Sequence, residues 1–356
     1  MIDYVELMIA SFIALVSTFF LVFPIKRLAI KWNVVDVPGK RKIHKHITPG
    51  MGGLAIFLGA AIGMVYLQPE HVNLMAISLG ACIIIVTGIL DDKYNIRPIV
   101  KLLGQLSAAA LLVFSGLVIE KLTVPFIGMV DLGWWGVPIT ILWVVGITNA
   151  INLIDGLDGL ATGVSTIGLL SMFVMSLIDL QLFAAYLSIV LIGANLGFLY
   201  HNFYPAKIYM GDTGSNFLGY MIAVISMLGL FKNVAILAFV IPVIILALPI
   251  FETVFSIVRR LINKQHVMEA DNKHIHYQLL HSGLSHPQTV IVLYAFAFLF
   301  GVLAIVFANA PLGVTVGVGL VILILVHILA ELAGIVFGGK KPIINSLARI
   351  FKRYKA

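Results

Sequence analysis

The chain is a succession of long apolar runs separated by short polar segments. Apolar runs of about 17–25 residues are typical of membrane-spanning helices, and lipid cannot satisfy the backbone of any open structure. We therefore predict an all-α, polytopic integral membrane protein with about eleven spans. They lie at 5–30, 50–67, 74–90, 99–119, 135–153, 159–178, 182–200, 214–230, 234–258, 288–309 and 312–337. Segments 159–178 and 182–200 nearly touch, which leaves ten as the alternative count.

Basic residues gather in alternate loops. Of 23 Lys and Arg residues, only Lys121 and Lys232 lie outside the loops 31–49, 91–98, 201–213 and 259–287, the adjoining helix ends and the tail. Positive charge is retained on the cytoplasmic side of a membrane, so these loops are predicted to face the cytoplasm. The amino terminus is then outside and the carboxyl terminus inside, which requires an odd number of spans and favours eleven.

A single domain accounts for nearly all of the chain. Residues 1–338 are predicted to form one integral membrane domain, and residues 339–356 a basic amphipathic tail. That tail is expected to lie in the membrane interface, with a frayed basic tail as the alternative. A small β-hairpin is predicted within 120–134. The first apolar segment lacks preceding basic residues, so we interpret it as an anchor and not a cleaved signal.

Composition narrows the class of protein further. The chain is 61% hydrophobic and 11% charged, whereas soluble domains contain about 25% charged residues. The net charge of +7 belongs to one face, and no soluble basic domain or aromatic–basic platform is present, so we expect no nucleic-acid partner. The single cysteine, Cys82, lies inside a span, which excludes an intrachain disulfide.

Five aspartates lie at the ends of apolar runs, all on the predicted cytoplasmic side. Carboxylates beside a bilayer are energetically unfavourable and usually functional. Gathered on one face, they can hold a divalent cation and the phosphates that it carries. This pattern indicates an enzyme that acts at the membrane surface on a phosphorylated substrate. The five are Asp91, Asp92, Asp155, Asp158 and Asp212.

The first pair ends the third span, in GILDDKYNIRP. The helix dipole disfavours negative charge at a carboxyl end, so local structure does not explain Asp91 and Asp92. The alternative is that they only pair with Lys93, Arg97 or Lys101.

The other three aspartates lie in two further connections. In NAINLIDGLDGLATG, four polar residues are spaced three apart and would share one helical face if the helix continues; they are Asn149, Asn152, Asp155 and Asp158. The alternative for Asp158 is an N-cap. Asp212 stands before a Gly-rich helix start, which favours phosphate binding, again with an N-cap as the alternative.

The last cytoplasmic loop contains three histidines, His274, His276 and His281. We interpret them as donors to a sugar or pyrophosphate. A closed zinc site is disfavoured because this loop contains no cysteine and Asp271 is the nearest acid. A solvated loop is the remaining alternative. Glu252 and Glu331, which lie in apolar stretches, are left unassigned.

Together these motifs resemble the polyprenyl-phosphate N-acetylhexosamine-1-phosphate transferases. The matching stretches are RKIHKHITPGMGG, GILDDKYNIRP, NAINLIDGLDGLA, GDTGSNFLGY and DNKHIHYQLLHSGLSH. They resemble the WecA/TagO branch more than the MraY branch, which uses UDP-MurNAc-pentapeptide. One departure is Tyr277, which stands where the branch typically has the last histidine of the pattern His-Ile-His-His.

The resemblance implies a Mg²⁺-dependent enzyme, with Mn²⁺ as a substitute, that transfers GlcNAc-1-phosphate from UDP-GlcNAc to undecaprenyl phosphate. The products would be a lipid-pyrophosphoryl sugar and UMP, in the first membrane step of cell-envelope polysaccharide synthesis. A homodimer is an open expectation for the family. The competing hypotheses are the MraY-type reaction and an ion-coupled secondary transporter, whose sites usually lie near the bilayer midplane.

The resemblance also implies roles for individual residues. Asp212 and Asn152 would hold the metal, and Asp91 would act as base or nucleophile beside Asp92. Asp155 and Asp158 would line the nucleotide pocket. The remaining substrate-binding residues that it implies are Lys45, Asn149, Asn202, Arg259, Arg260, His274, His276 and His281.

Overall fold

The computed structural model describes residues 4–36, 47–124, 128–229, 239–262, 264 and 274–334. Most of these residues are helical, as predicted. In chain order, the helices are α1 (Tyr4–Lys31), α2 (Gly53–Leu67), α3 (Leu74–Tyr94), α4 (Pro98–Phe114), α5 (Gly136–Ile154), α6 (Leu160–Ile178), α7 (Leu182–Asn202), α8 (Gly211–Gly229), α9 (Val240–Ile245), α10 (Ala247–Ile262), α11 (Ile275–His281), α12 (His286–Asn309) and α13 (Leu312–Leu332).

Two short antiparallel strand pairs and a 3₁₀ turn complete the described elements. The pair β1 (Val35–Asp36) and β2 (Thr48–Pro49) precedes α2, whereas β3 (Lys121–Val124) and β4 (Gly128–Asp131) precede the 3₁₀ turn (Gly133–Trp135). The second pair confirms the hairpin predicted within 120–134. The predicted tail, 339–356, lies outside the described residues.

Each of the eleven predicted segments contains a helix, but the ninth is broken. Pro249 has no N–H to donate to Ile245, four residues earlier, and the helix is interrupted at Leu246 between α9 and α10. The fourth segment is also shorter than predicted, since α4 ends at Phe114. Within the described residues, seven helices are long and apolar enough to cross a membrane, and α2 and α4 are shorter apolar helices. The number of spans and the orientation therefore stay predictions.

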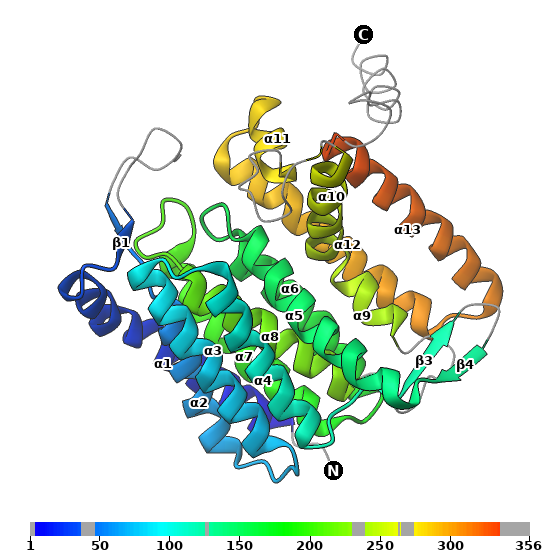
Figure 1. The fold of residues 1–356 in the computed structure, drawn as a ribbon, viewed down its shortest axis with the longest axis horizontal. Helices are drawn as coiled ribbons and strands as arrows, with labels where there is room; N and C mark the ends of the chain where they lie inside the picture. The colour runs from blue at the N-terminus through cyan, green and yellow to red at the C-terminus, as the bar shows by residue number, and fades with distance from the viewer. Residues whose placement is uncertain are drawn as a thin grey trace.

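Helix α8 lies at the centre of the bundle and is buried along almost its whole length. It packs against α3 and α5 and also contacts α2, α6 and α7. Figure 1 shows β1, α11 and the carboxyl end of α13 at one end of the molecule, with the β3–β4 hairpin at the other. The described parts of the loops that were predicted to be cytoplasmic thus share one end of the bundle.

Candidate active site

A short turn brings the first aspartate pair against α4. Asn95, with φ 49°, ends α3 in the left-handed conformation, and Pro98 starts α4. Lys101 consequently lies in the first turn of α4 beside Asp91 in the last turn of α3. Its Nζ is 3.0 Å from Asp91 Oδ2. Of the pairings considered from the sequence, this one is present.

The same ammonium group joins four helices. Lys101 Nζ is 2.6 Å from Asp212 Oδ1 in α8 and donates to Asn152 Oδ1 in α5 at 3.3 Å. Asn152 Nδ2 in turn donates to Asp212 Oδ1 and, at 2.8 Å, to Ser215 Oγ. A cation therefore already lies between two carboxylates. The Asp212 side chain is 33% exposed and that of Asp91 only 7%, so Asp212 is the more accessible to a ligand.

Asp92 has a different role from its neighbour. Its Oδ1 accepts the N–H of Asp212 at 2.7 Å, and its Oδ2 accepts the N–H of Thr213 at 3.2 Å and the Thr213 hydroxyl at 2.6 Å. Asp92 thus caps the start of α8 from another helix. The predicted phosphate site at this helix start is occupied by a carboxylate, and Asp212 lies in the first turn of the helix and not at its cap.

Gly211 makes this cap sterically feasible. Its φ is 71°, a conformation that side-chain-bearing residues rarely adopt. A Cβ at this position would also lie 2.5 Å from Asp92 Oδ2. Both the backbone conformation and the space beside the carboxylate therefore require glycine.

The connection after α5 does not continue as a helix, so the condition under which the four polar residues would share one helical face is not met. Asn149 and Asn152 lie on α5, whereas Asp155 ends it. Asp158 is not an N-cap, because Gly159 takes that position with φ 76°. The Asp158 Oδ2 instead accepts the N–H of Ala206 at 2.9 Å.

Asp155 lies close enough to the other acids to respond to their charge. Burial, together with the negative charges of Asp212, Asp92 and Asp158, raises the pKa of the Asp155 carboxyl to about 8. This shift means that a proton is held at Asp155 at neutral pH when no cation compensates the surrounding negative charge.

Two predicted substrate-binding asparagines form structural contacts. Asn149 Nδ2 donates to Gln105 Oε1 at 2.8 Å, and Gln105 Nε2 donates to Asn216 Oδ1 at 3.1 Å. Asn202 is buried, accepts from the Thr162 hydroxyl at 2.8 Å and donates to the carbonyl of Ile208 at 3.0 Å. Asn202 therefore fixes the loop that leads into α8.

The histidine motif is anchored by Glu252 of α10, which the sequence analysis left unassigned. His274 Nδ1 lies 3.0 Å from Glu252 Oε1, which also accepts the N–H of Ile275 at 2.8 Å. The His274 and His276 rings are nearly parallel, with centroids 5.5 Å apart. His274 is the N-cap of α11, and His276 lies in its first turn.

His276 connects this motif to the loop after α5. A Cβ on Gly156 would lie 2.4 Å from His276 Nε2, so the imidazole reaches the backbone between Asp155 and Asp158. Burial, together with the nearby His274 and His286, lowers the pKa of His276 to about 3. His276 is thus a neutral imidazole at physiological pH. Tyr277, the departure from the family pattern, packs on it with ring centroids 4.3 Å apart.

The other predicted residues lie in α10, in α11 or outside the described residues. His281 is exposed at the end of α11. Arg259 and Arg260 are buried in the last turn of α10, and Arg259 Nη1 donates to the carbonyl of Ala333 at 2.9 Å. Lys45 lies outside the described residues. However, the segment that follows it is placed near α8, because Gly53 N–H donates to the carbonyl of Met210 at 2.9 Å.

The sequence did not indicate the amides of Gln105 and Asn216 or the contact between Glu252 and His274. Asn216 follows Asp212 by one helical turn and donates to its carbonyl at 2.7 Å, a spacing that could have indicated it. Glu252 stands out in the sequence as a carboxylate inside an apolar stretch, but its contact with His274 does not. Within the described ranges, no group of three or more His, Cys, Asp or Glu side chains is arranged to hold a metal ion. A cation here would need ligands from water or substrate.

Comparison with known proteins identifies the family to which these residues belong. The glycosyl transferase family 4 model matches residues 74–230, which contain all five aspartates. The chain is 47% identical to the probable undecaprenyl-phosphate N-acetylglucosaminyl 1-phosphate transferase of Bacillus subtilis, over 97% of both chains. The chain belongs to the polyprenyl-phosphate N-acetylhexosamine-1-phosphate transferases. Its resemblance to the WecA/TagO branch is thereby confirmed.

Other members of this transferase family are more distant. The decaprenyl-phosphate N-acetylglucosaminephosphotransferase of Mycobacterium tuberculosis is 33% identical over 85% of this chain and 83% of its own. The phospho-N-acetylmuramoyl-pentapeptide-transferase of Halalkalibacterium halodurans is 30% identical over 84% of this chain and 95% of its own. Similarity is thus greater to the transferases named for GlcNAc.

Proposed function

We propose that this transferase moves GlcNAc-1-phosphate from UDP-GlcNAc to undecaprenyl phosphate and releases UMP, with its active site facing the cytoplasm. The observation that carries this proposal is the Lys101 ammonium held between Asp91 and Asp212 where four helices meet. Phosphoryl transfer between two anions depends on positioning and charge neutralisation. A buried set of paired charges at one end of a membrane bundle meets both needs.

The residues around Lys101 also fit Mg²⁺. This ion prefers oxygen ligands, keeps several waters, and is commonly bound by one or two carboxylates together with substrate phosphates. Asp212, with Asn152 beside it, is the more exposed carboxylate and would hold the ion. Bound there, Mg²⁺ would neutralise charge on the diphosphate. The shortage of protein ligands agrees with an ion that arrives with the nucleotide.

In the proposed reaction, a phosphate oxygen of the lipid attacks the β-phosphorus of UDP-GlcNAc. A new P–O bond forms, the bond to the bridging oxygen breaks, and UMP leaves with that oxygen and its electron pair. A phosphate monoester has its second pKa near 6 and is mostly dianionic at neutral pH, so it needs little help from a base. Asp91 is paired with Lys101 and nearly buried, which favours orienting the acceptor over a covalent role.

The histidine motif would hold the donor beside this cluster. Glu252 fixes the ring of His274, and the neutral His276 reaches the loop that carries Asp155 and Asp158. Neutral imidazoles can donate to phosphate or sugar oxygens without adding charge. This placement agrees with a nucleotide pocket between α11 and the loop after α5.

The test is turnover by the purified chain with UDP-GlcNAc, undecaprenyl phosphate and Mg²⁺. We expect stoichiometric UMP and lipid-linked GlcNAc, with neither product when the lipid is omitted or EDTA is added. UDP-GalNAc and UDP-MurNAc-pentapeptide are the matched donors. Faster turnover with UDP-MurNAc-pentapeptide than with UDP-GlcNAc would mean that the chain catalyses the muramoyl-pentapeptide reaction instead. Failure with all three donors in protein that retains its fold would overturn it.

A further inference from the structure

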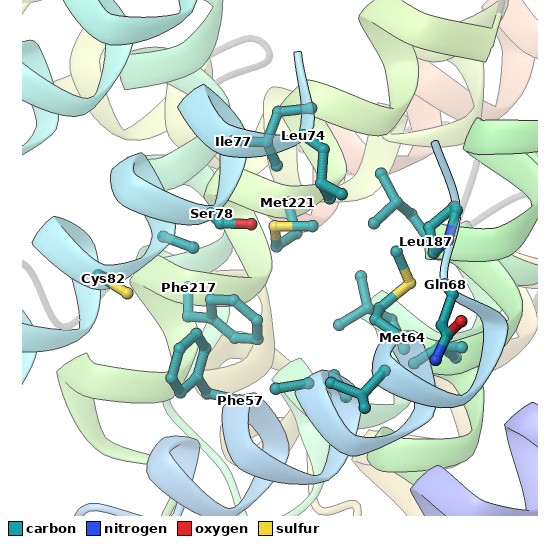
Figure 2. Close-up of a pocket in the computed structure, with 17 residues that line it drawn as sticks. Phe57, Met64, Gln68, Leu74, Ile77, Ser78, Cys82, Leu187, Phe217 and Met221 are labelled. Atoms are coloured by element: carbon teal, nitrogen blue, oxygen red, sulfur yellow. The ribbon is translucent and has the colours of Figure 1, made fainter. Parts of the chain in front are cut away.

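The described helices line an apolar, partly open cavity that the proposed reaction does not use. It has a volume of about 440 Å³ and lies between α2 and α3, with α7 and α8 behind them. Figure 2 shows Phe57, Met64, Phe217 and Met221 around this space, with Ser78 and Gln68 among its few polar side chains. Its size is within the range of about 300–1,000 Å³ that is usual for ligand pockets.

Close helix packing separates this cavity from the aspartates. A Cβ on Gly53 would lie 2.0 Å from the Cα of Gly214, and one on Gly88 would lie 2.4 Å from the Cα of Thr213. Both α2 and α3 therefore touch the start of α8. The Phe57 and Phe217 rings, with centroids 5.4 Å apart, close the cavity just beyond these contacts. The cavity extends from there toward Gln68 at the opposite end of α2.

The rim of the cavity belongs to the exposed apolar surface of the bundle. Val65 of α2, which lines the cavity, is 70% exposed, and Met75 of α3, next to the lining residue Leu74, is 76% exposed. An apolar cavity does not hold water. Helices that cross a bilayer are covered by hydrocarbon, so hydrocarbon is the solvent available to this space.

We propose that the cavity binds one hydrocarbon chain of a bilayer phospholipid from the leaflet opposite the aspartates. The head group would lie at the Gln68 end, and the chain would run inward between α2 and α3. The acceptor lipid is a poorer occupant because its phosphate would lie at the aspartates, on the other side of the glycine contacts. The inference does not depend on the proposed reaction.

The test uses purified protein in vesicles that contain a phospholipid with a diazirine in the middle of one acyl chain. After illumination, we expect crosslinks on four lining residues of α7 and α8 that are at most 5% exposed: Leu187, Leu191, Phe217 and Met221. Lipid that merely surrounds the protein cannot reach these side chains. No crosslink at any of them in the wild-type protein would overturn the proposal.

Substitutions that fill the cavity, compared with one on the exposed surface beside it, test whether the crosslinks come from this site. Ser78→Phe, which fills the cavity from α3, should lower those crosslinks at least tenfold, as should Ala61→Phe from α2. Leu79→Phe is the matched control, since Leu79 is exposed and does not line the cavity, and it should leave them within twofold. Equal crosslinking in Ser78→Phe and Leu79→Phe would contradict the site. Crosslinks from a diazirine-tailed polyprenyl phosphate, but not from the phospholipid, would overturn the choice of occupant.

Discussion

The two ends of α3 and α8 differ in packing and in polarity. At one end, glycines bring α2 and α3 against α8, and the side chains around Lys101 are charged and hydrogen-bonded to one another. At the other end, apolar side chains of α2, α3, α7 and α8 line a cavity of about 440 Å³. Helices in lipid associate through small residues and polar contacts, not through apolar burial. The comparison indicates that the helices pack closely where charged groups must be positioned and leave a cavity where the surface is apolar.

The largest effect is expected from removing a charge at the crowded end. Asp212→Asn should lower the rate of UMP release at least 10³-fold, because it removes a carboxylate that would hold Mg²⁺ and that pairs with Lys101. Asp131→Asn is the matched control, since Asp131 is exposed in the hairpin at the other end. A rate within twofold of wild type in Asp212→Asn would remove this residue from the site.

Removal of the Lys101 ammonium group should have the next largest effect on the rate. Lys101→Met leaves Asp91 and Asp212 side by side without compensation, and breaking a buried ion pair by removing one partner costs about 3–5 kcal/mol. We expect a lower melting temperature and a rate about 10²-fold below wild type. Asp91→Asn in the Lys101→Met background should recover part of the melting temperature, since it removes one of the two charges. No recovery would argue against charge repulsion as the cause.

Larger side chains introduced at the two ends should lower the melting temperature by different amounts. Gly88→Ala places a methyl group against the backbone of Thr213, and overpacking of this kind costs about 1–3 kcal/mol. Ser78→Phe adds a whole ring at the open end and should lower the melting temperature less than the single methyl group does. Thermal unfolding of both variants in the same detergent measures this difference. The reverse order would mean that the glycine contacts can relax and that the cavity cannot accept a side chain.

The smallest effect concerns pH. The pKa of Asp155, raised to about 8, means that this carboxyl is protonated below pH 8 when no cation is bound. Binding of Mg²⁺ would then release a proton, so the Mg²⁺ concentration for half-maximal rate should fall as pH rises from 6 to 8. The fall should be shallower in Asp155→Asn, which has no proton to release. Identical slopes in the two proteins would exclude Asp155 from this coupling.

The sequence alone predicted most of the helices, because apolar runs in lipid have few alternatives to a helix. It also predicted that the aspartates gather, since all five lie at helix ends that the charge pattern assigns to one side. It failed where partners come from distant parts of the chain. Nothing near Asp92 in the sequence indicates that it caps α8, and nothing near Glu252 indicates that it anchors His274.

Local pattern thus determined the class of protein, the helical segments and the set of candidate residues. Tertiary structure decided which carboxylate is exposed, which one is used as a cap, and where α5 ends. It also decided that α2 and α3 line a cavity beyond Gly53 and Gly88. The physical reason is that hydropathy and charge act on each segment separately, whereas hydrogen-bond partners and packing volume exist only after the segments meet.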